Sequence, residues 1–429
     1  MRAAIWLVTL FAVAVAIALF AGNNQAVVTL FWPPHRVDIS FNLAVLLLAG
    51  LIALVHLALR AMAAVFSLPL QARRWRAQQK ERAMYAAFMD GISHLTAGRF
   101  IRASRSAENA LQQESGLRVL AQEIHHDTGH NPARSVQLRA LAHLLAAESA
   151  QSLQNRTLRD SHLEQALTPA GPAFTVETGE GIQLRAAHWA LQDRDPGAAI
   201  GLLNQLPQGA SRRTLALRLK LRATRQAGLT QDALETARLL AKHRAFSPQA
   251  AQSILRGLGM ELLNGAHDSE QMQRAWHALD DAERAMPELA IHAANRLMAV
   301  QGEAELARQW LLGVWDTVMA PQAGLGSNIR VKLVCALESG LASIDAAWLA
   351  RIEAALQSSP RDANLQYLAG MACLNRQLWG KAQQLLSQAA LALQDVSLRR
   401  KAWRAVAQLA EERGDEAAAN AAFRRAAEA

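Results

Sequence analysis

The sequence predicts an all-α protein with an N-terminal two-helix transmembrane hairpin, followed by an α-solenoid of stacked helix pairs. Three observations support this fold class. Two long apolar runs without a charged residue lie near the N-terminus. In the rest of the chain, apolar residues recur at spacings of three and four, which is the period of an amphipathic helix. Glycine and proline interrupt that pattern at short intervals, as turns between short helices do.

Each apolar run is long enough to cross a bilayer. The runs cover residues 3–21 and 41–59, and a helix rising about 1.5 Å per residue would span about 28 Å over either one. The link between them, residues 22–40, contains two consecutive prolines, which cannot continue a helix. A cleaved secretory signal is the alternative for the first run. That run is longer than a usual signal core, however, and Phe20 stands where a cleavage site requires a small residue.

Basic residues predict the orientation of this anchor, which we assign to residues 1–82. Six of them follow the second run within residues 60–82, whereas the link carries only Arg36. By the positive-inside rule, both termini are then cytoplasmic and the link is periplasmic. The anchor also holds most of the formal net charge of +9, which indicates contact with anionic lipid headgroups and no nucleic-acid binding. His56 lies inside the second run, and we interpret it as a side chain that reaches toward the basic end.

A repeated spacing of small and aromatic residues predicts helix pairs in the tail, residues 83–429. Small residues let two helices approach closely, and aromatic residues fill the space beside them. The spacing resembles the tetratricopeptide repeat, although a generic helical bundle is the alternative. It occurs at Gly91, Gly98, Phe100, Ala103, Ala107 and Ala110, at Gly370, Trp379, Ala382, Leu386 and Ala389, and at Trp403, Ala407, Gly414, Ala419, Phe423 and Ala426. Weaker copies include Ala186, Trp189, Ala198 and Leu202, Leu221, Gly228, Ala233 and Ala237, and Asn295, Gly302, Ala307 and Leu311.

The sequence contains no motif of a known catalytic class. It lacks a dinucleotide-binding glycine turn between a strand and a helix, a phosphate-binding loop, a nucleophile elbow and a zinc-protease motif. Cys335 and Cys373 lie far apart and are interpreted as free buried thiols. We therefore expect no enzyme activity, no catalytic residues, no metal site and no tightly bound cofactor.

His126 and His130 are the candidates for binding a haem or another cofactor. Four residues apart, they would share one helix face, a spacing that can hold a metal or offer an axial ligand to haem iron. Gly129 ends the helix at this point, however, and a histidine near a helix C-terminus also interacts favourably with the helix dipole. Both interpretations stay open.

Arginines on one helix face predict a partner groove. Arg218, Arg222 and Arg225 are spaced to form a single stripe, and His292 and Arg296 take comparable positions two repeats later. Arginine pairs bidentately with carboxylates, so an acidic peptide tail or the propionates of a porphyrin would suit such a groove. A plain solvated face would produce the same stripe.

Several segments together resemble the HemY family. These are the apolar runs joined by Trp32–Ser40, the basic segment after them, the repeat from Phe88 to Ala103 and the segment Ile291–Asn295. The resemblance implies a tetratricopeptide protein of the bacterial inner membrane that has a role in late haem biosynthesis. It supplies no catalytic residues, and it does not extend to the flavin-dependent protoporphyrinogen oxidase that shares the name.

The resulting hypothesis is a membrane-anchored scaffold that organises haem-pathway enzymes through protein–protein contacts. One alternative is a protein or enzyme subunit that itself binds haem or porphyrin. Another is an envelope-assembly factor, because anchored tetratricopeptide proteins also serve there. Fold alone does not choose among these functions.

Overall fold

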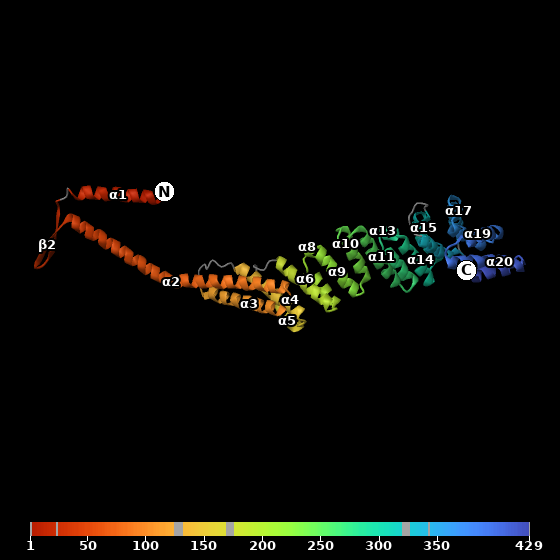
Figure 1. Ribbon diagram of the computed structural model, residues 1–429, viewed down its shortest axis with the longest axis horizontal. Helices are drawn as coiled ribbons and strands as arrows, with labels where there is room; N and C mark the ends of the chain where they lie inside the picture. Colours follow the sequence, from red (N-terminus) through yellow and green to blue (C-terminus); the bar gives the residue numbers. More distant parts are fainter. Residues whose placement is uncertain are drawn as a thin grey trace. The chain divides into compact units, whose positions relative to one another are not determined.

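The computed structural model describes residues 2–22, 25–123, 132–168, 176–319, 327–341 and 344–428 (Figure 1). Most of these residues are helical, as the sequence predicts. The chain forms two compact units, residues 1–178 and 179–429, which are described separately below. The predicted boundary between anchor and tail, at residue 82, falls inside one continuous helix of the first unit.

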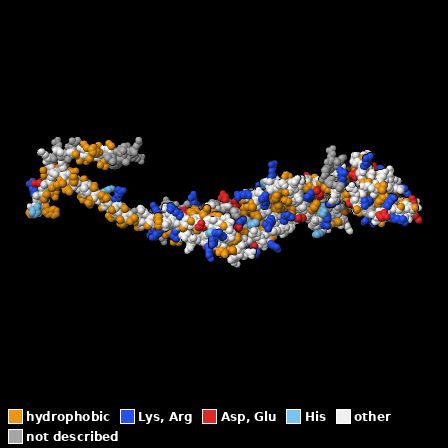
Figure 2. Space-filling view, viewed as in Figure 1, with side chains coloured by type: hydrophobic (Ala, Val, Ile, Leu, Met, Phe, Trp, Pro, Cys, Tyr) orange, Lys and Arg blue, Asp and Glu red, His pale blue; other side chains and the backbone are white. Residues whose placement is uncertain are grey.

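The first unit contains five helices and two strands among its described residues. They are α1 (Arg2–Ala21), β1 (Val27–Trp32), β2 (His35–Ser40), α2 (Phe41–Thr96), α3 (Phe100–Glu123), α4 (Pro132–Ser152) and α5 (Arg156–Leu167). Within the described part of the chain, only α2 meets the length and hydropathy expected of a membrane span, which is weak evidence for anchoring. Figure 2 shows its apolar side chains exposed along the N-terminal half of the helix. The predicted two-helix transmembrane hairpin is therefore not confirmed.

The link between the apolar runs forms a β-hairpin, which corrects the all-α prediction. β1 and β2 pair antiparallel, with Val27 opposite Ser40 and Trp32 opposite His35. The physical reason is the density of β-branched and aromatic residues before and after the proline pair, because these residue types favour strands. Ser40 then caps α2, since its Oγ accepts a hydrogen bond from the Leu43 N–H at 3.3 Å.

The C-terminal end of α2 packs on α3 as the first helix pair, at the predicted place. Gly98 forms the turn with a φ of +70°, a conformation that other residues rarely adopt. Ala103 and Ala107 on α3 have no exposed surface. A Cβ atom on Gly91 would lie 2.6 Å from Cδ2 of Leu145 on α4, so a larger residue would require the Leu145 side chain to move. α4 packs in turn on α3 and α5.

The second unit continues the series of helices. They are α6 (Val176–Gln192), which begins just before the boundary, α7 (Pro196–Asn204), α8 (Gln208–Ser211), α9 (Thr214–Gln226), α10 (Thr230–Lys242), α11 (Pro248–Asn264), α12 (Ser269–His277), α13 (Asp281–Arg284), α14 (Pro287–Ala299), α15 (Ala304–Met319), α16 (Ser327–Glu338), α17 (Ala346–Ser358), α18 (Ala363–Asn375), α19 (Trp379–Ala392), α20 (Val396–Glu411) and α21 (Glu416–Glu428).

Helices of the second unit stack as pairs. α14 packs on α15, α18 on α19 and α20 on α21, while α14 also contacts α11 and α16, and α18 contacts α16 and α20. Each first helix thus lies beside the first helix of the next pair, which is the arrangement of a solenoid rather than of a closed bundle. This packing agrees with the predicted repeat array.

The predicted packing positions of the terminal repeat are buried, with one exception. Trp403, Ala407 and Ala426 lie in the interior, but Phe423 is 39% exposed. The prediction that Phe423 is buried is therefore wrong. Among the described residues no later helix covers the outer side of α21, so an aromatic residue at this position lacks its usual neighbour.

The weak copy around residue 190 is shifted by one position. Ala199 and Leu203 are buried, whereas Ala198 is exposed and Leu202 is half-buried.

The two cysteines are free, with Cys373 buried and Cys335 half-buried. Burial raises the pKa of both thiols, which keeps them protonated and weakly nucleophilic.

Candidate functional site

The arginine stripe predicted from the sequence lies on the exposed side of α9. The other side of this helix packs into the interior through residues such as Leu217 and Leu221. Because apolar and basic residues alternate with the helical period, burying the leucines leaves Arg218, Arg222 and Arg225 facing outward. The helix is therefore held by its apolar face while its cations remain accessible.

These three arginines line one groove of about 590 Å³. The floor is apolar, with Phe246 from the turn after α10 and Ile254 from α11. Glu261, also on α11, is the acidic residue in the lining. The complete lining is Arg218, Leu221, Arg222, Arg225, Gln226, Phe246, Ile254 and Glu261.

The three arginines of the groove differ in the hydrogen bonds and ion pairs that they make within the protein. Arg218 donates from Nη2 to the carbonyl oxygen of Ala245 at 3.0 Å. Arg225 Nη2 lies 3.5 Å from Glu261 Oε1, and both side chains are about half exposed, so solvent screens this pair to between about 0 and 1 kcal/mol. Within the described residues, Arg222 has no hydrogen-bond or ion-pair partner. In the groove, Arg222 is thus unpaired among the described residues, and it lies between Arg218 and Arg225, each of which makes one contact within the protein.

His292 and Arg296 lie on α14, and the structure does not bring them into this groove. His292 Nε2 lies 2.8 Å from Asn264 Oδ1, and Arg296 donates from Nη2 to the Ala266 carbonyl oxygen at 2.9 Å. Burial and, secondarily, the charge of Arg296 lower the pKa of His292, which favours the neutral ring. Both side chains therefore bind the end of α11, where carbonyl groups lack partners within the helix.

Arginine contacts of this kind recur between successive helix pairs. Arg308 Nη1 donates to the Gly340 carbonyl oxygen at 2.8 Å, and Arg376 Nη2 donates to the Ile344 carbonyl oxygen at 2.6 Å. These arginines of the tail thus bind backbone carbonyl groups near helix ends rather than line a groove. Sequence spacing does not separate these structural arginines from Arg222, because the distinction depends on which carbonyl lies opposite each side chain.

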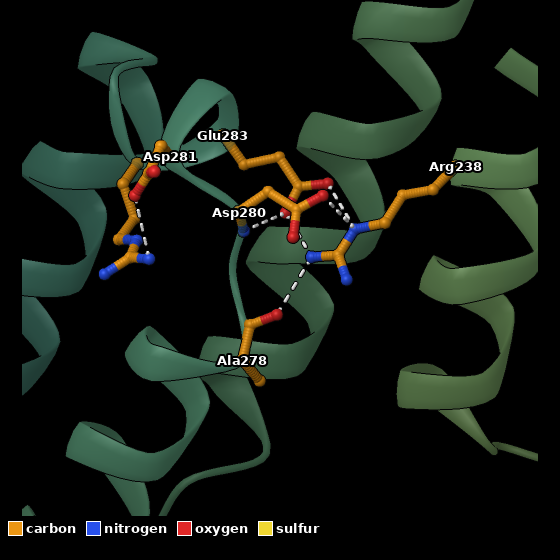
Figure 3. Close-up of polar contacts among 6 residues, drawn as sticks. Arg238, Ala278, Asp280, Asp281 and Glu283 are labelled. Atoms are coloured by element: carbon orange, nitrogen blue, oxygen red, sulfur yellow. Dashed lines mark hydrogen bonds and ion pairs between the residues drawn. The ribbon is translucent and has the colours of Figure 1, made fainter. Parts of the chain in front are cut away.

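The most extensively bonded of these arginines is Arg238 on α10. Its Nε and Nη2 donate to the two carboxylate oxygens of Glu283 at 2.9 and 2.6 Å, and Nη2 also donates to the Ala278 carbonyl oxygen at 2.9 Å (Figure 3). Asp280 adds an ion pair at 3.1 Å. The bidentate hydrogen bond to Glu283 and the nearby carboxylates raise the pKa of Arg238, although burial opposes this. This cluster joins α10 to α13 and to the turn that precedes α13.

The candidate cofactor residues His126 and His130 lie outside the described residues. In the part of the chain that the structure describes, no group of three or more His, Cys, Asp or Glu side chains is arranged to hold a metal ion. Sequence reasoning missed a different histidine pair, His143 on α4 and His162 on α5, whose Nδ1 atoms are 3.1 Å apart. A separation of nineteen residues gives no sequence signal of contact, because only the packing of α5 on α4 brings the two rings together.

Comparison with solved structures gives matches of low similarity. A chain of the Naa15/Naa10 complex bound to HypK-THB is 14% identical with a TM-score of 0.24, over 78% of this chain and 57% of that one. The P58(IPK) TPR domain is 14% identical with a TM-score of 0.23, over 77% and 99%. An IFIT1 monomeric mutant with Gppp-AAAA is 12% identical with a TM-score of 0.20, over 80% and 71%. Likenesses this weak carry no argument about fold or function.

Sequence comparison gives a more specific result for the N-terminal part. No curated protein matches the chain. Residues 27–126, however, match the family described as HemY protein N-terminus. The match covers the β-hairpin, α2 and α3, including the first helix pair. The resemblance to the HemY family that the sequence predicts is thereby confirmed for residues 27–126.

Proposed function

We propose that this protein is a membrane-anchored scaffold that supports late haem biosynthesis by holding pathway enzymes through protein–protein contacts. The observation that carries the proposal is the HemY N-terminal match over residues 27–126, together with helix pairs that continue for the rest of the chain. Solenoids present long accessible surfaces to other proteins, because each repeat contacts only its neighbours. The proposal includes no catalytic role for this chain.

Membrane anchoring through two spans is part of the proposal. The apolar start of α2 supports one span. The second span is proposed from the sequence of the first apolar run, residues 3–21, which contains no charged residue. The excess of basic residues within 60–82 supports a topology in which both termini lie in the cytoplasm and the anchor spans a bacterial inner membrane. Fusions of alkaline phosphatase and of a fluorescent protein to the C-terminus test this topology. Fluorescence without phosphatase activity is expected, and the reverse would contradict the topology.

We further propose that the groove on α9 receives an acidic segment of a partner enzyme. Its three arginines outnumber the one acidic residue, and Phe246 and Ile254 offer an apolar floor for a side chain of the same segment. Arg222 supports the assignment most directly, since it is the cation that the described protein leaves unpaired. Carboxylates binding there would form charge-assisted hydrogen bonds.

Crosslinking in membranes followed by identification of the captured proteins tests the scaffold. Haem-pathway enzymes should be captured by the wild-type protein, and the amount captured should decrease with the Arg222→Glu variant. Arg274→Glu on α12 is the matched control, because Arg274 is an exposed helix arginine with only a weak pair to Glu270. Equal capture by all three proteins would contradict the proposed role of the groove. Absence of any pathway enzyme among the captured proteins would contradict the proposed scaffold function.

A groove of cations over apolar residues also suits a porphyrin, whose propionates and ring have the same two properties. Titration of the purified protein with haem and with porphyrins, followed by absorbance, separates this second candidate from the first. Saturable binding that Arg222→Glu weakens would favour a porphyrin-binding protein. The same preparation should neither oxidise protoporphyrinogen nor insert iron, and either activity would contradict a non-catalytic role.

A further inference from the structure

The β-hairpin between the two apolar runs has one apolar face and one polar face. Successive residues of a strand point to opposite sides, and residues paired across two strands point to the same side. Three pairs therefore share one face: Val28 with Ile39, Leu30 with Val37, and Trp32 with His35. The pairs on the opposite face are Val27 with Ser40, Thr29 with Asp38, and Phe31 with Arg36. Both the aspartate and the arginine of the hairpin lie on that second face, and we call the first one the apolar face.

The apolar face is open to its surroundings rather than packed on the protein. Leu30, Trp32 and Val37 are each more than half exposed, whereas Val28 and Ile39, at the end next to α2, are half-buried. Figure 2 shows apolar side chains on the surface of this segment. A two-stranded hairpin by itself is at best marginally stable in water, because it has no second layer on which to bury its apolar side. The hairpin therefore needs a further surface to cover this face.

The chain holds the hairpin at the end of the proposed membrane span. β2 ends at Ser40 and α2 begins at Phe41, so no linker separates the hairpin from the helix (Figure 1). At the base of the hairpin, the Phe41 N–H donates to the carbonyl oxygen of Ala26 at 2.8 Å. The six residues of each strand extend only about 20 Å, at about 3.4 Å per residue. Because the apolar run of α2 starts at Phe41, the hairpin stays close to the bilayer surface.

The size of the apolar face favours lipid over a folded protein as the occupant. Two strands spaced about 5 Å apart, each about 20 Å long, offer roughly 200 Å² on one side. A standard protein interface uses about 800 Å² on each partner, so this face is too small to hold a protein stably by itself. Insertion into lipid requires no matching shape. Trp32 suits the boundary between lipid and water, because an indole ring is apolar and its N–H is polar.

The opposite face of the hairpin is suited to water. Arg36 Nε lies 3.2 Å from Asp38 Oδ1, and both side chains are about half exposed. The Arg36 guanidinium also lies over the ring of Phe31, 5.7 Å from its centroid, as a cation–π contact. These contacts hold the two charges together away from the apolar face. The apolar face can therefore enter lipid without removing either charge from water.

We propose that the hairpin lies on the bilayer surface and inserts its apolar face into the boundary between headgroups and acyl chains, with Trp32 as its anchor. The proposal rests on the membrane anchoring proposed above, because α2 brings the hairpin to the bilayer. It adds a second point of attachment beside the span and keeps the Arg36–Asp38 pair on the water side. The hairpin then restricts the tilt and rotation of α2, since interfacial anchors set both in membrane helices.

Fluorescence quenching of the full-length protein in vesicles of phosphatidylethanolamine and phosphatidylglycerol tests the insertion. A polarity-sensitive fluorophore is attached to one cysteine at a time, in protein that carries Cys335→Ser and Cys373→Ala. Leu30→Cys and Val37→Cys place the label on the apolar face, and Thr29→Cys places it on the opposite face. Labels at 30 and 37 should emit at shorter wavelength and be quenched by nitroxide groups on lipid acyl chains. The label at 29 should instead be quenched by iodide in the water.

Trp32→Glu and Phe31→Glu form a matched pair of variants for the same measurement. The two aromatic side chains are adjacent in sequence and are 74% and 75% exposed, but they lie on opposite faces. Trp32→Glu should reduce the lipid quenching of the label at 30, because it places a charge on the inserted face. Phe31→Glu should leave that quenching unchanged. Equal effects of the two variants would contradict insertion through one face.

A label at Leu46→Cys, inside the apolar run of α2, separates this proposal from the anchoring itself. Lipid quenching at 46 but not at 30 and 37 would overturn the hairpin insertion and leave the anchoring intact. Shielding of 30 and 37 from both quenchers would also overturn it, because a protein surface would then cover the apolar face. Absence of lipid quenching at 46 would overturn the anchoring and the insertion together.

Discussion

Replacement of Arg238 by methionine is the sharpest test of how the helix pairs are joined. Arg238 on α10 is 23% exposed, but the Glu283 carboxylate that it binds is only 3% exposed. Without the guanidinium, Glu283 keeps one hydrogen bond, in which its Oε2 accepts from the Asp280 N–H at 3.0 Å. The substitution therefore leaves a buried carboxylate without a countercharge.

The expected loss of folding stability comes from the burial of Glu283 rather than from the attraction between the two charges. Removing one partner of a buried ion pair costs about 3–5 kcal/mol, because the remaining charge stays desolvated. Arg238 is itself partly exposed, so water can enter the vacated space, and we expect about 3 kcal/mol, the lower end of that range. Arg238→Met/Glu283→Met removes both charges and should recover most of the loss.

Native-state hydrogen exchange of the purified protein measures this loss where it occurs. A repeat array does not unfold in one step, so a local free energy of opening is more informative than a single melting temperature. Arg238→Met should accelerate exchange in α10 and in the turn between α12 and α13, and leave α2 and α3 unchanged. The exchange rates convert into a free energy of opening for each helix.

Arg225→Met is the matched control, because the pair of Arg225 with Glu261 is long and half exposed. It should cost between about 0 and 1 kcal/mol. If the two single variants lose equal stability, burial of the carboxylate is not the cause. If the double variant is as unstable as Arg238→Met, the desolvation argument is wrong.

Three further predictions concern the last repeats. Gly370→Ala would place a Cβ atom 2.7 Å from Cγ of Leu386 and should lower the free energy of opening of α18 and α19 by about 1–3 kcal/mol, measured by hydrogen exchange. Asp395 caps α20, and hydrogen bonds from Leu398 N–H and Ser397 lower the pKa of its carboxyl group. The ionised cap therefore stabilises α20 fully above the ordinary pKa of 3.8, and this stabilisation is lost as the pH falls through the lower pKa of the folded protein. Asp395→Ala should cost about 1 kcal/mol and should remove this pH dependence of hydrogen exchange in α20. Trp403→Ala should lower the free energy of opening of α20 by about 3–5 kcal/mol, measured by hydrogen exchange, and Phe423→Ala should cost clearly less because Phe423 is 39% exposed. Equal losses would contradict the argument from exposure.

The sequence by itself determined the helical class, the position of several repeats and the family of the N-terminal part. Each of these depends on local spacing. Glycine is favoured at position 98 because of its positive φ, and alanine at 103 and 107 because two helices touch there. The β-hairpin at 27–40 is also encoded locally, in β-branched and aromatic residues of the segment that the sequence analysis treats only as a link between the two apolar runs.

Only the tertiary structure decided what each polar side chain does. Arg222 and Arg296 have similar helical surroundings in the sequence, yet one faces an open groove and the other binds the carbonyl oxygen of Ala266. His143 and His162 meet because α5 packs on α4, whereas neither position carries a motif. Contacts between helices depend on rotation about each helix axis and on the neighbouring pair, and a shift of one residue, as at Ala199, changes which side chains face each other.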